Sequence, residues 1–436
     1  VHFDTGRGIP EYLAALNRLF PGSEKEIRKI GWEIRKWSKM TATLNRLPNP
    51  YLKNPLLHMK YLFTRFIPWL PGFLRVLVRT GLNKSSVEGV LASITENQSL
   101  NDMVSQHFFK GTPAPFAFGY FESFQDYLYP TGGTGSLPKA LEQKILALGG
   151  EVEYNSEAAK VFPESRRLAA KDGSEYAYDQ LLWSADLKSL YQRIDDTGLP
   201  QRRRKAVERE KQQILSVKPG ESVFTLFLGV DKPPEYFQNI SQGHFIYTPD
   251  TRGLGSLHRE RLKEIKSNFS SVTTEELFSW AQEFCARNAF EIGVPALRDA
   301  SLAPANQTGL VVSLLCDGEV FQLVKNAGWL AEFREHMECC MVNVLDRSVY
   351  PGLKESLLFS KSATPITLMK RFDLTAGAIT GWSLEEKAPV PNSLAGIFGA
   401  PKTVIPNVYK AGQWSYSPSG VPIAVLTGRA AAGLMS

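Results

Sequence analysis

"YPTGGTGSLPKALEQKILALGG", residues 129–150, is the stretch that decides the fold. A glycine-rich turn runs into a segment whose apolar residues recur at positions 137, 141, 145 and 148, the spacing of a helix. Ser136 is expected to cap this helix, Pro138 suits its first turn, and Gly149 is expected to end it. The stretch lacks the G-x-x-x-x-G-K-[ST] pattern of a phosphate loop. The spacing of the glycines alone does not distinguish a ligand-binding turn from a loop that only reverses the chain before a helix.

Composition sets broad limits on the protein. The 436 residues are 43% hydrophobic and 22% charged, as in a soluble globular protein of two or three domains. Four cysteines without a C-x-x-C, and six histidines without metal-ligand spacing, indicate a reducing compartment and no structural metal. The sequence starts at Val1, so we expect an N-terminal part to be missing, and no signal peptide is visible.

Charge is distributed unevenly along the chain. Between Ile34 and Val87 there are ten basic residues and no acidic one, interleaved with aliphatic and aromatic side chains. This pattern is typical of a peripheral segment in a membrane interface. The residues expected to meet the membrane are Arg65, Trp69, Phe73, Arg75 and Arg79. No stretch is long enough to span a bilayer, and Pro68 and Pro71 are expected to break the segment.

The basic residues allow two alternatives to membrane binding. The segment 34–87 could be a helical lid packed on the protein's own core, its cations solvated. Nucleic acid is not an expected partner, because the basic run at 201–211 is partly neutralised by its own glutamates and is typical of a solvated helix.

Periodicity predicts the order of the remaining elements. Helices are expected over 9–47 and 85–109, a hairpin turns at Asp172-Gly173, and a buried strand follows over 180–184. Further strands are expected at 222–230, 244–249, 309–315 and 407–412, and further helices at 274–290, 328–347 and 420–435. This order predicts two interleaved domains.

Most catalytic motifs are absent from the sequence. There is no G-x-S-x-G, no H-E-x-x-H, and Gly6-Arg7-Gly8 lacks the third glycine of a dinucleotide fingerprint. The helix expected to open at Gly420-Val421-Pro422 offers free N–H groups and a partial positive charge, which could stabilise a bound anion or cofactor. The alternative is tight packing of helix on sheet without a ligand.

Seven sequence blocks, in order, give the chain a family resemblance. They are "FDTG" (3–6), the glycine turn and helix (129–141), "GGEVEYNSEAAKV" (149–161), "LLWSAD" (181–186), "DASLAPANQTG" (299–309), "ATPITLMKRF" (363–372) and 407–431. The chain thereby resembles the FAD-dependent oxidoreductases of the phytoene desaturase, carotenoid isomerase and retinol saturase group. It departs from that group in lacking the N-terminal G-x-G-x-x-G and ribose-binding acid, in the short connection after Gly6, and in Ala158 and Ser419.

The resemblance implies roles for individual residues. Ala411, Gly412, Gln413 and Trp414 would follow the flavin's ribityl chain, and Ser419, Gly420, Val421 and Pro422 would set a helix end beside the pyrimidine ring. Ala158 would touch adenine, Ala185 would lie near the same end, and Thr134, Gly135 and Ser136 would line the substrate cavity. The reaction would be hydride transfer between flavin N5 and an apolar polyene. The resemblance identifies no catalytic base.

The resemblance also implies the architecture, a mixed α/β fold. A Rossmann-like FAD-binding domain, incomplete at its N-terminus, would be interleaved with a β-sheet substrate domain and a helical membrane-associating lid. Its parts would be an FAD-domain remnant (1–8), the lid (9–125), the FAD domain (126–200), the substrate domain (201–370) and a return to the FAD domain (371–436).

The sequence leaves two rival functions open: an amine-oxidase-like flavoenzyme acting on a polar substrate, and a non-catalytic lipid-binding protein that has lost FAD. The expected location is peripheral, on the cytoplasmic side of a membrane or on an organelle membrane, and the oligomeric state is open.

Overall fold

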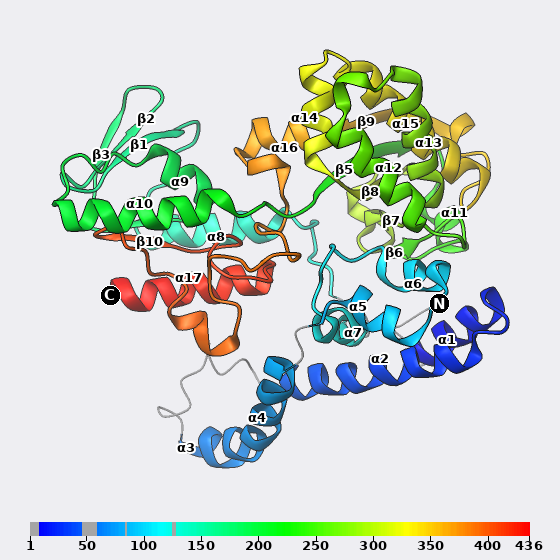
Figure 1. Ribbon diagram of the computed structural model, residues 1–436, viewed down its shortest axis with the longest axis horizontal. Helices are drawn as coiled ribbons and strands as arrows, with labels where there is room; N and C mark the ends of the chain where they lie inside the picture. The colour runs from blue at the N-terminus through cyan, green and yellow to red at the C-terminus, as the bar shows by residue number, and fades with distance from the viewer. Residues whose placement is uncertain (1–7, 46–58, 83–84, 124–127) are drawn as a thin grey trace.

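The computed structural model describes residues 8–45, 59–82, 85–123 and 128–436. The "FDTG" block and all but the last residue of the expected 1–8 remnant lie outside the described residues. Figure 1 shows a unit of helices at one end, a sheet covered by helices above it, and a second α/β unit beside that sheet.

The first unit is helical, as its periodicity predicts. Helices α1 (Gly8–Leu19) and α2 (Glu24–Asn45) meet at a turn where Gly22 has a φ of +91°. Ile30, Ile34 and Trp37 of α2 are buried at helical spacing. They form one core with residues of α5 (Val87–Ile94), α6 (Gln98–Ser105) and α7 (Ala114–Ser123).

The basic segment continues as a helical rod, α3 (Met59–Tyr61), a π-helical turn (Leu62–Phe66) and α4 (Ile67–Leu82). The expected break at the prolines is therefore wrong. Pro68 lies in the first turn of α4 and Pro71 within it, so each proline removes at most one ladder bond while the inward face stays packed. None of the described helices is long and apolar enough to cross a bilayer.

The second unit contains two small sheets. Strands β1 (Ala158–Phe162), β2 (Arg167–Ala170) and β3 (Glu175–Ala177) are antiparallel, with the predicted hairpin turning at Gly173, φ +91°. Strand β4 (Leu181–Trp183) pairs in parallel with β10 (Val408–Lys410), in the register Leu182 to Tyr409. Helices α8 (Ser136–Ala147), α9 (Leu187–Arg193), α10 (Gln201–Ser216) and α17 (Val421–Met435) complete this unit.

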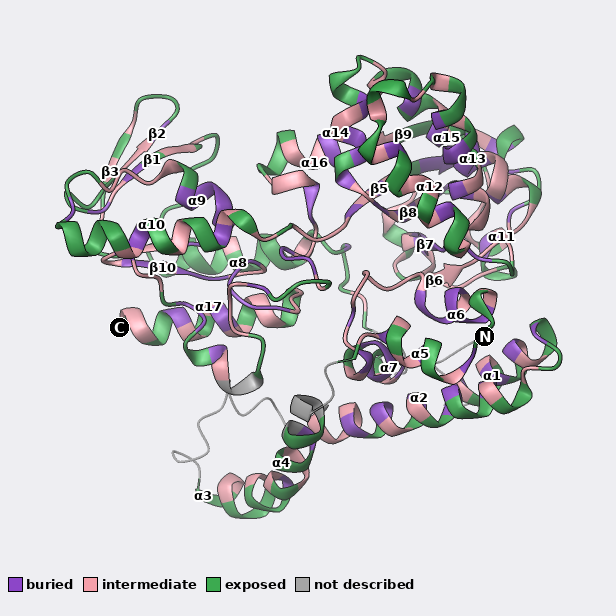
Figure 2. Cartoon of the chain, viewed as in Figure 1, coloured by how far each residue is buried: buried purple, intermediate pink, exposed green. Residues whose placement is uncertain are grey.

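Helix α8 differs from the prediction in its cap. The helix begins at Ser136, whose hydroxyl donates to the Gly133 carbonyl at 2.7 Å, so Gly135 is the N-cap residue. Gly149, at φ +80°, ends the helix as predicted. None of its residues is buried, and its apolar stripe, which includes Leu141 and Ile145, is exposed (Figure 2).

The third unit is a five-stranded antiparallel sheet in the order β6-β7-β8-β5-β9. Its strands are β5 (Ser222–Val230), β6 (His244–Tyr247), β7 (Phe290–Gly293), β8 (Thr308–Cys316) and β9 (Leu357–Ala363). Alternate residues of β5 and β8, such as Leu226 and Val312, are buried in one core with side chains of the surrounding helices. The helices are α11 (Pro234–Gln238), α12 (Gly255–Ser267), α13 (Thr274–Arg287), α14 (Gly318–Asn326), α15 (Leu330–Arg347) and α16 (Pro365–Phe372).

The chain crosses between the second and third units twice. It leaves after α10, and it returns along 375–383, where Gly220 donates to the Gly381 carbonyl at 2.7 Å and Ile379 to the Glu221 carbonyl at 3.2 Å. Helix α10, assigned by sequence to the substrate domain, instead packs in the second unit through Val207 and Ile214. The first crossing is therefore at about 217–221 and not at residue 200.

A buried carboxylate joins the helical unit to the third unit. Asp102 on α6 accepts bonds from Arg259 of α12 at 2.8 and 3.2 Å and from the Gly255 amide at 2.6 Å. The Asp102 side chain is only 1% exposed. The arginine therefore compensates a charge that water cannot reach.

We expect Asp102→Ala to lower the free energy of unfolding by about 3 kcal/mol, because it strands the Arg259 guanidinium at the interface between the units. Asp250→Ala, which removes a more exposed ion pair with Arg252, is the matched control and should cost less than about 1 kcal/mol. Urea unfolding followed by tryptophan fluorescence measures both. Equal losses would mean that Asp102 contributes no more than a surface charge.

Candidate functional site

The carboxyl ends of the parallel strands β4 and β10 form the centre of the candidate site. The Ala411 amide donates to the Trp183 carbonyl at 3.0 Å, which brings the two strand ends together. Gly412 follows with φ +85°, and a Cβ there would lie 3.3 Å from the Ser184 carbonyl oxygen. Ala185, the second residue after β4, is exposed. Ala411 and Gly412 therefore lie against Trp183 and Ser184, directly before Ala185, and the carboxyl ends of parallel strands are where α/β folds bind ligands.

The loop from β10 to α17 is fastened to that helix. The Gly412 amide donates to the Thr427 hydroxyl oxygen at 3.1 Å, and the Ser415 hydroxyl donates to the Gly412 carbonyl at 2.7 Å. Thr427 is itself fully buried on α17. These bonds fix the loop before any ligand binds. The peptide Ser417–Pro418 within the loop is cis.

A pair of buried tryptophans fixes the middle of this loop. The Trp414 ring meets Trp382 edge to face, with centroids 4.8 Å apart, and the Trp382 indole N–H donates to the Trp414 carbonyl at 2.9 Å. The Lys188 ammonium lies 5.8 Å from the Trp382 ring centroid. A Cβ on Gly381 would lie 2.8 Å from the Gln413 carbonyl oxygen, so the return crossing lies directly against the loop. Trp382 and Lys188 were missed because nothing local distinguishes them from core residues.

The N-terminus of α17 has the features of a ligand-binding helix end. Its N-cap residue, Gly420, supplies no side-chain cap, and Val421 after it is exposed. Free N–H groups here carry a partial positive charge. The Ser419 hydroxyl and the Trp414 indole N–H are buried without a partner in the described part of the chain. Unpartnered polar atoms beside an open helix end fit a flavin or another electron-rich group.

Asp186 organises the other strand end. Its carboxylate caps α9 by accepting from the Lys188 amide at 2.8 Å, and it accepts from the Thr375 amide on the return crossing at 2.7 Å. Burial raises its pKa despite these bonds. Burial also lowers the pKa of Lys188, whose ammonium donates to the Leu215 and Val217 carbonyls.

The glycine turn contacts the third unit. The Gly132 amide donates to Asp299 at 2.7 Å, and this bond holds the pKa of that carboxyl below its ordinary value. A Cβ on Gly133 would lie 3.5 Å from Leu302. The turn that includes Thr134, Gly135 and Ser136 is thus positioned by the "DASLAP" loop. No described interaction joins it to the loop of Gly412.

Ala158 lies elsewhere in the second unit. It opens strand β1 opposite Ala170 and is partly buried against the core of that unit. No described hydrogen bond links it to the β10–α17 loop, so its expected adenine contact stays a prediction.

The face of the large sheet opposite its helix-covered core is partly exposed. Phe227 and Val311 are paired there across strands β5 and β8, beside the hydrogen-bonded hydroxyls of Thr225 and Ser313. Phe227, which is exposed, and Val311 give this face an apolar patch that suits contact with an apolar chain, while Lys361 lies opposite Phe227 on β9.

A histidine–carboxylate pair lies on the same sheet. His244 on β6 and Glu291 on β7 are 2.8 Å apart, and this hydrogen bond lowers the pKa of Glu291. His107 of the helical unit acts on the same carboxylate, and burial lowers the pKa of His107 to about 4. Sequence reasoning missed the pair because the short strand β7 was not predicted. The described residues include no cluster of potential metal ligands.

The membrane candidates divide between two faces of the α3–α4 rod. Arg65, Arg75 and Arg79 are exposed. Trp69 is only 8% exposed, donates to the Thr43 carbonyl at 2.7 Å and stacks on Phe73 at 4.5 Å. The structure therefore gives Trp69 a packing role against α2.

Comparison with known proteins identifies relatives of this chain. Residues 98–277 match the family of flavin containing amine oxidoreductases. A phytoene desaturase (lycopene-forming) of Pseudescherichia vulneris is 23% identical over 70% of this chain and 56% of its own length. A chloroplastic prolycopene isomerase of Daucus carota is 22% identical over 69% of this chain and 42% of its own. The chain thus spans about half the length of these curated relatives.

Solved structures agree on the fold. A putrescine oxidase bound to putrescine superposes with a TM-score of 0.53 at 13% identity, covering 95% of this chain and 77% of that one. The mixed helix-and-sheet fold is therefore that of the amine-oxidase-type flavoenzymes, and FAD is the cofactor that the comparisons support.

We expect Gly412→Ala to lower the free energy of unfolding by about 1–2 kcal/mol, because an alanine strains the left-handed backbone and crowds the Ser184 carbonyl. Gly428→Ala, in the open middle of α17, is the control and should be neutral or stabilising. Thermal unfolding of the two variants side by side measures the difference. Equal midpoints would contradict a strained strand end.

Proposed function

The chain is related to the flavin-containing amine oxidoreductases, and on that premise we propose that it desaturates, saturates or isomerises a hydrophobic isoprenoid, carotenoid or retinoid-like polyene. Similarity to a phytoene desaturase and a prolycopene isomerase supports this substrate class. The observation that carries the proposal is the α3–α4 rod, which is apolar on two faces.

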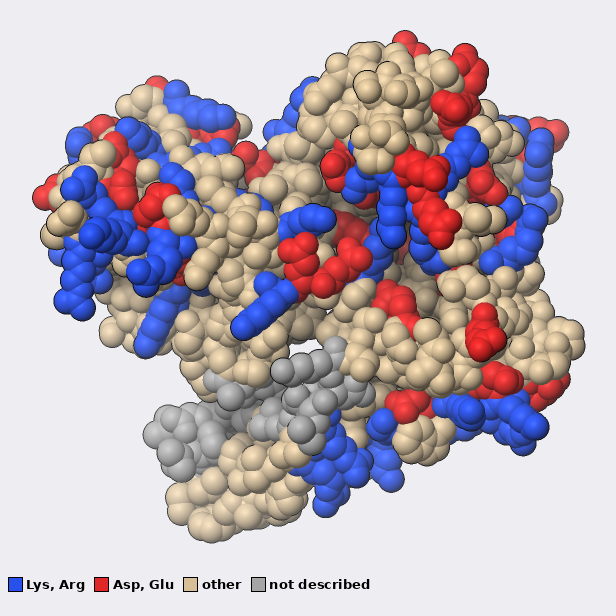
Figure 3. Space-filling model, viewed as in Figure 1, with Lys and Arg blue, Asp and Glu red and all other residues tan. Residues whose placement is uncertain are grey.

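One face of the α3–α4 rod packs against the rest of the helical unit. Trp69 and Val76 point inward, Val76 into the core of the helical unit. The opposite stripe is exposed and repeats at helical spacing: Met59, Phe63, Ile67, Leu74 and Val78. In Figure 3 the surface formed by α3 and α4 is mostly uncharged, with basic side chains beside it. An exposed apolar stripe flanked by arginines suits the interface of an anionic membrane, the source of a water-insoluble substrate.

The residues that would hold FAD are those around the end of β10. Gly412, Gln413 and Trp414 would lie along the cofactor, and Ser419, Gly420, Val421 and Pro422 would present the helix end to it. When bound, FAD supplies hydride transfer at its N5 atom. The positive end of α17 would stabilise negative charge on the ring. The segment 411–422 contains no acid, lysine or histidine, which fits a reaction without proton relay.

The two alternative functions, a polar-substrate amine oxidase and a lipid-binding protein without FAD, are less well supported. An amine-oxidase-like enzyme acting on a polar substrate would have no use for the exposed stripe of α3–α4, although His244 and Glu291 could serve it. A non-catalytic lipid-binding protein would have no use for the open helix end and unpartnered polar atoms at Ser419 and Trp414.

FAD binding is tested by the absorbance of the purified full-length protein with added FAD. Flavin bands that persist after gel filtration, and that bleach with dithionite, are the expected result. The substrate class is then tested by supplying phytoene or prolycopene in liposomes, with putrescine as the polar control. Flavin binding with turnover of putrescine alone would favour the amine-oxidase alternative. A colourless protein that takes up no FAD would leave only the lipid-binding alternative.

Membrane binding is tested with Leu74→Glu/Val78→Glu. Two charges in the exposed stripe should weaken co-sedimentation with anionic liposomes at least tenfold. Leu257→Glu/Leu358→Glu, which charges two exposed leucines of the third unit, is the matched control and should bind as the native protein does. Comparable binding by both double variants would rule out the rod as the membrane contact.

A further inference from the structure

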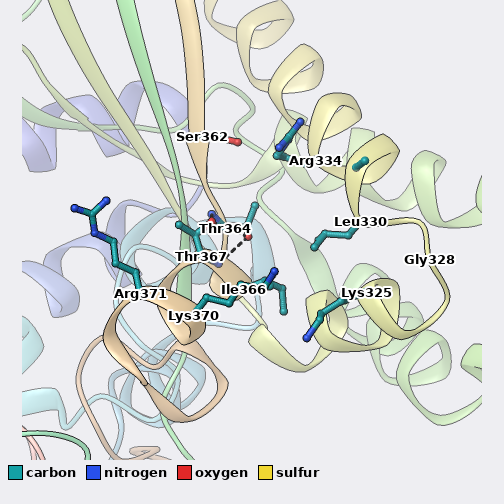
Figure 4. Close-up of a pocket in the computed structure, with 11 residues that line it drawn as sticks. Lys325, Gly328, Leu330, Arg334, Ser362, Thr364, Ile366, Thr367, Lys370 and Arg371 are labelled. Atoms are coloured by element: carbon teal, nitrogen blue, oxygen red, sulfur yellow. Dashed lines mark hydrogen bonds between the residues drawn. The ribbon is translucent and has the colours of Figure 1, made fainter. Parts of the chain in front are cut away.

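A cavity of about 610 Å³ opens on the third unit, away from the β10–α17 loop. Figure 4 shows its walls: the end of α14, the start of α15, the last residues of β9, and α16. Thr364 and Ile366 are buried at its base. Four cationic side chains line it: Lys325, Arg334, Lys370 and Arg371.

The charge of this cavity is only partly compensated. Among the described residues that line it, none carries a carboxylate. Arg334 lies 3.5 Å from Glu335 and 3.7 Å from Glu338, but Lys325, Lys370 and Arg371 have no ion pair within the part of the chain that the structure describes. Like charges gathered around one concavity repel each other and concentrate a positive potential within it.

A helix end adds to this potential. The N-cap of α15, Trp329, provides no side-chain cap, and Leu330 and Ala331 of its first turn line the cavity. The free N–H groups of that 18-residue helix therefore start at the cavity wall. The N-terminus of α16 is capped. The Thr364 hydroxyl oxygen accepts from the Thr367 amide and the Thr367 hydroxyl oxygen accepts from the Thr364 amide.

We propose that this cavity binds a phosphate ester. Lysine ammonium groups, an arginine fork and free helix N–H groups are the donors that phosphate oxygens prefer. The volume lies within the roughly 300–1,000 Å³ of small-molecule sites, so the ligand extends beyond its phosphate. The site goes beyond the proposed flavin chemistry, and it shares no lining residue with the candidate flavin loop.

The test uses the full protein in the presence of excess FAD, with inorganic pyrophosphate as the probe in calorimetric titration. Lys325→Gln/Lys370→Gln removes two uncompensated charges while keeping the length of the side chains, and it should weaken binding at least tenfold. Lys354→Gln/Lys361→Gln is the matched control, because both lysines are exposed and Lys361 lies on the opposite face of β9 from Ser362. Binding should also weaken with salt.

Each outcome of the titration either supports or overturns the phosphate-ester site. Saturable binding that only the first double variant loses supports the site, whether or not the protein binds FAD. No saturable binding, or the same loss in both double variants, overturns it. A second arm uses phosphatidylcholine vesicles with and without phosphatidic acid. If the first variant loses binding to phosphatidic acid as well, the natural phosphate ester is a lipid headgroup, and loss with pyrophosphate alone identifies a soluble ligand.

Discussion

The candidate cofactor site depends on one buried carboxylate, Asp186. It lies three residues after the end of β4, caps α9 and accepts the Thr375 amide of the return crossing. Burial raises its pKa, so the fold holds it where a carboxylate is unfavourable, at the junction of two units. The return crossing that it anchors then carries Trp382 to the β10–α17 loop. The hydrogen bonds of Asp186 therefore hold the return crossing against the end of β4, and through that crossing they help to position the β10–α17 loop.

The helical unit is joined to the large sheet in the same way. Asp102 is a buried acceptor on one unit that satisfies a main-chain amide and an arginine on another. The large sheet that these junctions hold carries the paired side chains of Phe227 and Val311, and the turn at Gly132 is bonded to Asp299 of the same unit. The α3–α4 rod needs only its inward side chains to stay packed, which leaves its outer stripe free to meet another surface.

Sequence could predict what local periodicity determines. The buried face of α2, strands β5 and β8, the turn at Gly173 and the small-residue helix α17 all follow from side-chain spacing. It could not predict β7, which has four residues, or the edge strand β9, whose exposed residues run Leu358, Phe359, Ser360 and Lys361 without an alternating pattern. The packing of α10 and the place of Trp382 depend on contacts between residues far apart in the chain. The continued helix through Pro71 reflects tertiary packing that overrides a local breaker.

The sequence blocks that carry the resemblance meet in pairs. The glycine turn at Gly132 is bonded to Asp299 of the "DASLAP" block, and the "LLWSAD" strand is bonded to the β10 block through Trp183 and Ala411. The first pair is positioned by the large sheet and the second by the parallel strands. Residues expected at a single flavin-and-substrate cavity therefore belong to two separately anchored walls. Main-chain amides donate both bonds, one to the Asp299 carboxylate and one to the Trp183 carbonyl, so the blocks depend on close backbone approach more than on reactive side chains. An enzyme whose chemistry resides in its cofactor has this requirement.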